Sequence, residues 1–203
     1  ADDAYFLLLE DTTSFNFDGR EISGLGVLED NRTAGFFAHN TLAVSEAGVP
    51  LGIFDQHVWS RPQNLERDKT AHKRKPIEEK ESYKWIQGIA QVPPDLASRC
   101  VVVSDRESDV YEFLQVMDND GLKHVTRLTH NRRIEAGGTL YQLLSTVSPA
   151  DTYQITVRRQ ANQAERIATV AVRFATVTLI PPKRDKEAQS IPMVPLQQQL
   201  VEV

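Results

Sequence analysis

Two short apolar runs in this 203-residue sequence each end at an aspartate, and this pattern constrains the fold more than any other feature. The first run, residues 5–10, ends at Asp11, and the second, residues 100–104, ends at Asp105. Continuous apolar runs of this length are typical of strands that are buried on both faces of a sheet. A carboxylate at the end of such a strand lies at the rim where α/β proteins build their sites. We therefore expect Asp11 and Asp105 to lie close together on neighbouring strands.

The composition is that of an ordinary globular protein. Hydrophobic residues make up 40% of the chain and charged residues 25%, which excludes the disordered class. No run of residues is long and apolar enough to predict a helix that crosses a bilayer. Cys100 is the only cysteine, so an internal disulfide is excluded and a reducing, cytoplasmic environment is expected.

The charge pattern leaves two interpretations open. A net charge of −5 argues against nucleic-acid binding, which usually requires a basic surface. The positive charges are clustered, however, in residues 67–75, 127–133 and 158–166. Each cluster alone is explained by a solvated loop or strand face, so the charge balance does not decide between the two interpretations.

The order of predicted elements indicates an α/β fold in which helices flank a mixed sheet. From residue 151 onwards the alternation becomes that of strands, which indicates an inserted or appended β-rich region. The predicted strands cover residues 5–10, 21–28, 35–44, 49–58, 100–103, 124–128, 153–157 and 167–180, the predicted helices cover 82–91, 110–117 and 140–145, and a long exposed loop covers 60–81.

Two carboxylates at one sheet edge would suit a hard divalent cation, because magnesium takes carboxylate oxygens and water as ligands. The local pattern alone also has structural explanations. Ser104 and Glu107 match the S-x-x-E capping box, and negative charge is favourable at a helix start. Asp11, in the run Asp-Thr-Thr-Ser, is equally suited to a turn.

Several other kinds of site are excluded by missing patterns. The five histidines show no close pair at zinc-ligand spacing, and one cysteine cannot complete a structural zinc site. The sequence has no G-x-S-x-G nucleophile elbow and no G-x-x-x-x-G-K-[ST] phosphate loop.

Four motifs that occur in one order carry a resemblance to a known family. Together they resemble the DDE-type cut-and-paste transposases of bacterial insertion sequences, in the branch with a Y-R-E-K signature. The resemblance runs from about residue 5 to about residue 180. It implies a ribonuclease-H-like catalytic core in residues 1–148 and an incomplete β-rich insertion in residues 149–203. The motifs are Asp11–Ser14, Gln56–Pro62, Glu78–Trp85 and Asp105–Asp109.

The resemblance implies roles for five residues. Asp11 matches the first catalytic aspartate of the family and Asp105 the second, and both are expected to bind Mg²⁺, with Mn²⁺ as a substitute. Arg127 falls where the family has an arginine that contacts DNA near the active site, and His130 and Arg132 lie in the same DNA-facing loop.

The sequence departs from the family pattern at two places. The family has a lysine two residues after the arginine, where this chain has Thr129. The third catalytic carboxylate of the family is a glutamate in a Y-x2-R-x3-E-x6-K pattern beyond the insertion, but no tyrosine follows Tyr153 here. The chain is therefore expected to carry two of three metal-binding carboxylates, either as a fragment of a longer protein or as the product of a truncated element.

The implied partner is double-stranded DNA, both at transposon ends and at the target. A homodimer on paired ends and a location at the prokaryotic nucleoid are expected with it. Two alternatives remain open: a truncated, non-catalytic DNA-binding or assembly remnant of a transposase, and a generic ribonuclease-H-like nuclease that cuts DNA without transposon ends.

Overall fold

The chain forms two compact units in the computed structural model. Unit 1 comprises Ala1–Thr129 and Pro182–Met193, and unit 2 comprises His130–Pro181 and Val194–Val203. The expected division into a core of residues 1–148 and an insertion of residues 149–203 stays a prediction. The structure describes residues 4–20, 22–30, 32–63, 74–159, 161, 163–184 and 189–203.

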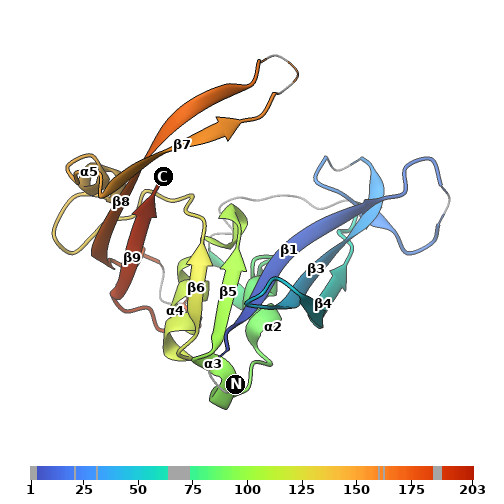
Figure 1. The fold of residues 1–203 in the computed structure, drawn as a ribbon. Helices are drawn as coiled ribbons and strands as arrows, with labels where there is room; N and C mark the ends of the chain where they lie inside the picture. Colours follow the sequence, from blue (N-terminus) through green and yellow to red (C-terminus); the bar gives the residue numbers. More distant parts are fainter. Residues whose placement is uncertain are drawn as a thin grey trace. The chain divides into compact units, whose positions relative to one another are not determined.

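Unit 1 is built on a mixed sheet, so the predicted α/β fold with helices flanking a mixed sheet is confirmed (Figure 1). The central strand, β1 (Phe6–Asn16), pairs antiparallel with β3 on one side and parallel with β5 on the other. β3 also pairs antiparallel with β4, and β5 pairs parallel with β6. The strands are β1 (Phe6–Asn16), β2 (Gly26–Val27), β3 (Ala34–Ser45), β4 (Pro50–Trp59), β5 (Cys100–Ser104) and β6 (Lys123–Thr126).

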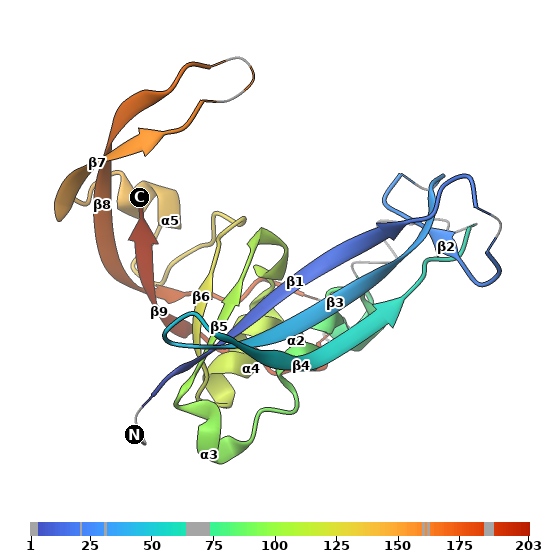
Figure 2. The same ribbon diagram turned by 45° about the vertical axis from the view of Figure 1, so that its right-hand side comes forward.

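Two helices cover one face of this sheet, α2 (Tyr83–Ile89) and α4 (Tyr111–Asn119) (Figure 2). Both were predicted from their apolar spacing. Trp85 of α2 and Phe113 of α4 are almost completely buried, and their ring centroids lie 6.3 Å apart. The helix-covered face of the sheet contributes Leu8 and Val102, which also have almost no exposed surface. Short turns complete the unit: η1 (Ile77–Glu79), α3 (Pro94–Ala97) and η2 (Arg106–Ser108).

Helix α2 approaches the sheet closely at Gly88. A Cβ atom added there would overlap the carboxylate of Glu10 and the hydroxyl of Thr41, both of which lie on strands beneath the helix. Any larger residue would force the helix and sheet apart, because protein interiors are close-packed. Gly88 therefore sets the distance between the helix and strands β1 and β3.

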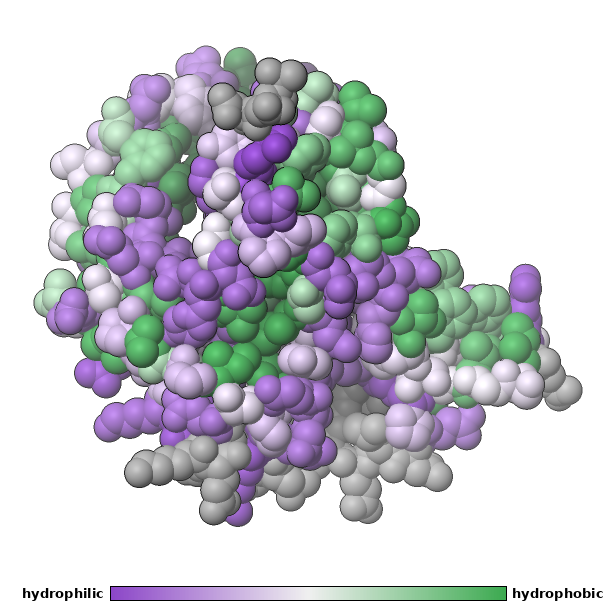
Figure 3. All heavy atoms as spheres, turned by 90° about the horizontal axis from the view of Figure 1, so that it is seen from below, coloured by the Kyte–Doolittle hydropathy of each residue, from purple (hydrophilic) through white to green (hydrophobic). Residues whose placement is uncertain are grey.

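The opposite face of the sheet is less covered by the described residues. Leu9 and Val103 are half-buried there, whereas Ile53 on β4 is 58% exposed and Val125 on β6 is 62% exposed. Exposed apolar side chains occur elsewhere too, and Figure 3 shows hydrophobic patches among hydrophilic side chains on one surface. No helix in the described part of the chain combines the length and apolar character needed to span a bilayer.

Unit 2 contains a short helix and an antiparallel three-stranded sheet. Its long strand β8 changes partner along its length, pairing with β7 through residues 166–172 and with β9 through residues 173–179. Arg173 stands at this change. Its Nη1 contacts Glu202 Oε2 at 2.9 Å, and its Nε donates to the carbonyl of Val147 at 3.0 Å. The elements are α5 (Leu140–Leu144), β7 (Asp151–Val157), β8 (Arg166–Leu179) and β9 (Leu196–Glu202).

Four predictions about elements need correction. The first strand, expected over residues 5–10, continues to Asn16, so Asp11 lies within β1 and not after its end. The strand expected over residues 21–28 is limited to Gly26–Val27 in the described residues, and the Gly26 backbone lies against the backbone of Arg61. The loop over 60–81 is partly structured, because Ile77 is buried in a 3₁₀ turn, and its residues 64–73 lie outside the described residues. Strand β9 was not predicted, because its glutamines give the segment a polar pattern, although Leu196 and Leu200 are buried.

Candidate functional site

Asp11 and Asp105 follow the last residue pair of the parallel ladder between β1 and β5. That ladder ends with Glu10 opposite Ser104. Asp105 keeps an extended backbone, with φ −85° and ψ −169°, so the strand geometry continues to it. Neighbouring strands lie about 4.8 Å apart. The structure therefore brings the two predicted aspartates to neighbouring strands just beyond this ladder, with Asp11 inside β1 and Asp105 after the end of β5. Their metal-binding role stays a prediction.

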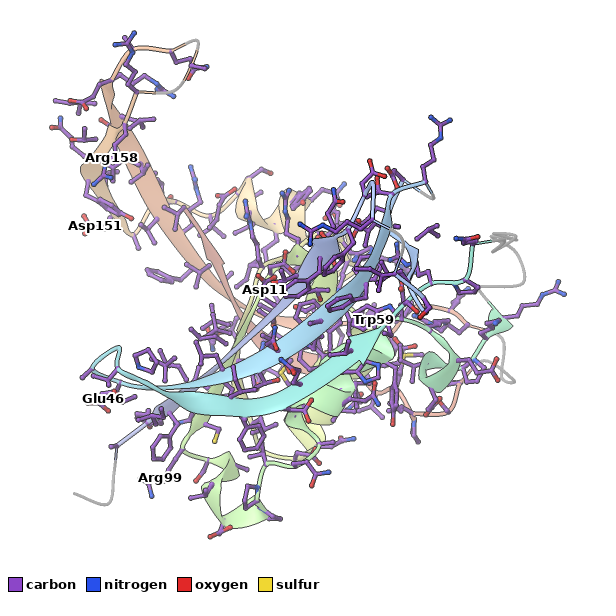
Figure 4. All side chains as sticks on the ribbon, turned by 90° about the vertical axis from the view of Figure 1, so that its right-hand side faces the viewer. Asp11, Glu46, Trp59, Arg99, Asp151 and Arg158 are labelled. Carbon is purple, nitrogen blue, oxygen red and sulfur yellow. The ribbon has the colours of Figure 1, made fainter. Side chains whose placement is uncertain are left out.

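Both aspartates take the face of the sheet that α2 leaves open. Side chains alternate along a strand, and Glu10 lies beneath α2, so Asp11 projects from the opposite face. Figure 4 labels Asp11 on β1, in the middle of the sheet. Both carboxylates are exposed.

Each carboxylate accepts one backbone hydrogen bond. Asp11 Oδ1 accepts from the Thr12 amide at 2.8 Å, and Asp105 Oδ1 accepts from the Glu107 amide at 2.9 Å. An ionised carboxylate offers about four acceptor positions, so most of its capacity remains for a ligand. These hydrogen bonds orient the carboxylates without occupying them fully.

The predicted capping box is wrong. The side chain of Asp105, rather than Ser104, caps the turn, and this turn is the short η2 and not the start of a long helix. Ser104 Oγ instead accepts from Ser108 Oγ at 2.7 Å. Helix α4 begins later, at Tyr111. Asp105 thus has a structural role at the turn, and that role is compatible with cation binding through its free acceptor positions.

Arg127 lies beside Asp105. Its backbone amide donates to the Ser104 carbonyl at 3.2 Å, so it follows the β5–β6 ladder just as Asp105 does. Its side chain is exposed. The other two residues predicted to contact DNA belong to unit 2, where His130 is exposed and Arg132 is half-buried.

Thr129 stands at the position where the family pattern has a lysine, and it makes two hydrogen bonds there. Its amide donates to Asp109 Oδ2 at 2.7 Å, and its hydroxyl donates to the Arg106 carbonyl at 2.9 Å. Asp109 is 1% exposed. These contacts tie the segment after β6 to the turn that holds Asp105.

The motifs quoted for the family resemblance are joined by side-chain contacts. Glu81 accepts from Arg61 Nε at 2.6 Å and Nη2 at 2.7 Å, and from Trp59 Nε1 at 2.7 Å. Lys84, which is 8% exposed, places its ammonium 3.5 Å from Glu107 Oε2. Three of the four motifs are thereby linked to one another around β4, α2 and the Asp105 turn.

A buried polar cluster lies beside Asp11 on the helix-covered face of the sheet. It was not predicted from the sequence. His39 Nδ1 lies 2.9 Å from Thr12 Oγ1, and Thr41 Oγ1 donates to Glu10 Oε1 at 3.3 Å. His39 Nε2 and Glu10 Oε1 are 4.0 Å apart, and neither His39 Nε2 nor Glu10 Oε2 has a hydrogen-bond partner among the described residues. A glutamate within an apolar strand was the available signal.

Burial keeps both groups of this cluster neutral near pH 7. It raises the pKa of Glu10 from 4.5 to about 8 because the carboxylate is removed from water. It lowers the pKa of His39 from 6.5 to about 4, with the nearby Lys84 ammonium as a further cause. Glu10 and His39 are therefore neutral neighbours and not an ion pair.

Two amides extend the row of polar residues on the open face, and these too were missed. Asn40 on β3 lies directly opposite Asp11, and Gln56 on β4 lies directly opposite Asn40. Gln56 Nε2 donates to Asn40 Oδ1 at 2.6 Å. Only the pairing register reveals this row, because the three residues are widely separated in the sequence.

Unit 2 carries the basic hairpin, defined here as strands β7 and β8 with the segment between them. Arg158, which is labelled in Figure 4, and Arg159 follow β7. Arg166 begins β8. All three side chains are exposed. Six arginines against four carboxylates give unit 2 a net charge of +2, whereas the chain as a whole carries −5. The electrostatic attraction for phosphate is therefore stronger in unit 2.

The oxygen donors of Asp11, Asp105 and Asn40 on the open face suit a hard cation. They belong to two carboxylates with an amide beside them, and such oxygen donors suit Mg²⁺ or Mn²⁺ rather than zinc. Within the described ranges, no group of three or more His, Cys, Asp or Glu side chains is placed to hold a metal ion. The site thus offers two carboxylate ligands. No protein-family model matches the sequence.

Proposed function

We propose that this chain is the catalytic-core portion of a DDE-type DNA transposase. The reaction would be phosphodiester hydrolysis at transposon ends, followed by strand transfer into target DNA. The single observation that carries the proposal is the β1–β5 register, which ends at Glu10 opposite Ser104, directly before Asp11 and Asp105. The mixed sheet with flanking helices supports the ribonuclease-H-like core that the motifs imply.

The aspartates and Arg127 have distinct roles in this proposal. Asp11 and Asp105 would hold the Mg²⁺. When bound, such ions activate the attacking oxygen and stabilise the leaving oxygen. Arg127, beside Asp105, would hold a phosphate near the scissile bond by a salt-sensitive contact.

The chemistry is a series of displacements at phosphorus. Water attacks the phosphodiester at the transposon end, a new P–O bond forms, and the 3′ oxygen leaves as a hydroxyl. That hydroxyl attacks a phosphodiester of the second strand and displaces a 3′ oxygen there. A second water then hydrolyses the new bond and frees the 3′ hydroxyl again, which attacks a phosphodiester of target DNA and displaces its 3′ oxygen. Double-stranded DNA is the partner, and pairing of two ends suits a homodimer at the nucleoid.

A second candidate is a non-catalytic DNA-binding or assembly remnant of a transposase. The basic hairpin in unit 2 favours it, because these exposed arginines would bind phosphate without any metal. Two carboxylates alone would also hold a cation more weakly than three. The two candidates differ in turnover and not in DNA binding.

Cleavage assays separate the candidates. The 203-residue chain, and a longer protein where its gene encodes one, are incubated with Mg²⁺ or Mn²⁺ and a labelled duplex that carries transposon ends. We expect cutting by a form that supplies a third carboxylate, and we expect the Asp11→Ala and Asp105→Ala variants of that form to bind DNA without cutting. Undiminished cutting by either variant refutes the assignment. Cutting of duplexes that lack transposon ends would instead indicate a generic nuclease.

A further inference from the structure

We infer that Asn40 is a positioning residue for the Asp11 carboxylate, and that Gln56 holds Asn40 in the required orientation. The inference rests on the proposed function, since it assumes that Asp11 is a cation ligand. It adds two residues that neither the aspartate pattern nor the family motifs assign to this role.

The sheet register supplies the geometry. Asp11, Asn40 and Gln56 are opposite one another on β1, β3 and β4, so their side chains share one face of the sheet. Side chains that lie directly opposite on antiparallel strands have Cβ atoms about 5 Å apart. Asn40 is thus the neighbour of Asp11 on the β3 side, as Asp105 is on the β5 side.

The hydrogen bond from Gln56 sets the orientation of the Asn40 side-chain amide. Because Gln56 Nε2 donates to Asn40 Oδ1 at 2.6 Å, the oxygen of that amide faces β4. This hydrogen bond does not use the amino group of Asn40. An amino group can only donate, and the exposed carboxylate of Asp11, opposite Asn40 on β1, is an acceptor of the matching kind.

A donated hydrogen bond from Asn40 would complete the orientation of Asp11. The Thr12 amide already donates to Oδ1 at 2.8 Å. A second donor from the β3 side would fix the carboxylate plane and still leave acceptor positions for a cation. Partners of this kind typically change metal affinity or activity by about 10- to 100-fold when they are removed.

The test measures Mn²⁺ affinity by electron paramagnetic resonance in the 203-residue chain. The variants are Asn40→Ala, Gln56→Ala, Asp11→Ala and the double variant Asp11→Ala/Asn40→Ala. The matched control is Gln199→Ala, which removes another exposed strand amide, bonded to Thr176 Oγ1 at 3.1 Å in unit 2. Thermal unfolding of every variant identifies any that fail to fold.

We expect Asn40→Ala to weaken Mn²⁺ binding by about 10-fold. Gln56→Ala should act in the same direction with a smaller effect, and the control should bind like the unmodified chain. Asn40→Ala should have no further effect once Asp11 is replaced, because the two residues act together.

Two outcomes overturn different claims. If Asp11→Ala weakens Mn²⁺ binding but folded Asn40→Ala and Gln56→Ala do not, the positioning role is wrong and the proposed function stands. If Asp11→Ala itself leaves Mn²⁺ binding unchanged, the proposed function fails, and the inference about Asn40 fails with it.

Discussion

Asp11 and Asp105 are adjacent across two parallel strands, although most of unit 1 separates them in the sequence. The relationship follows from the parallel register, in which each aspartate follows the last residue pair of the β1–β5 ladder. The same row continues through Asn40 and Gln56 on one side and Arg127 on the other. One row across the open face of the sheet therefore presents carboxylates, amides and a guanidinium together.

The buried pair of Glu10 and His39 leads us to predict how the stability of the protein depends on pH in metal-free buffer. The pKa of Glu10 rises to about 8 on folding, so its stabilising contribution is complete below pH 4.5 and is lost as pH rises through 8. The pKa of His39 falls to about 4, so its contribution is present above pH 6.5 and is lost as pH falls through 4.

Glu10→Gln should therefore flatten the alkaline side of the stability profile, because the amide cannot ionise. Urea unfolding measured between pH 4 and 9 checks this expectation. Glu46→Gln is the matched control, since Glu46 is exposed (Figure 4). An alkaline decline that persists unchanged in a folded Glu10→Gln variant would contradict the assignment of this titration to Glu10.

Gly88→Ala should destabilise unit 1 by about 1–3 kcal/mol, because the added methyl group overlaps Glu10 and Thr41. Helix propensity alone would give the opposite sign, since alanine is favoured over glycine by about 1 kcal/mol within a helix. Chemical denaturation measures the sign directly. Gln87→Ala in the same helix serves as the comparison, and a Gly88→Ala variant more stable than the unmodified chain would show that the helix does not approach the sheet as described.

Arg127→Ala should weaken DNA binding to a similar degree for different sequences. If the arginine neutralises one phosphate, the slope of log K against log salt concentration should decrease by about 0.9. Fluorescence anisotropy over a salt series gives this slope. Arg20→Ala, at an exposed arginine in the loop between β1 and β2, should leave it unchanged. An unaltered slope for Arg127→Ala would remove this residue from the DNA-binding surface.

Much of the framework of unit 1 could be predicted from the sequence, because its signals are local. The apolar runs at β1 and β5 predict buried strands directly. The apolar spacing within α2, which includes Trp85, and within α4, which includes Phe113, predicts helices with one buried face. The two aspartates could be predicted for the same reason, since each ends a local pattern.

The missed features depend on contacts between distant segments. Glu10 and His39 form a buried pair only because α2 covers them, and no local pattern in either strand predicts that cover. The position of Asn40 beside Asp11 depends on the β1–β3 register. At Ser104, the motif suited a capping box, but Asp105 is the residue in the right backbone conformation to cap the turn.

Paramagnetic broadening by Mn²⁺ tests the central claim most directly. Backbone amide resonances of the 203-residue chain are recorded during a titration with Mn²⁺, and again for Asp11→Ala. A cation shared by the two carboxylates predicts that the amides of Thr12 and Arg106 broaden together at low Mn²⁺ concentration, and that both remain sharp in the variant. Broadening at only one of these amides, or equal broadening in Asp11→Ala, would contradict a joint site formed by Asp11 and Asp105.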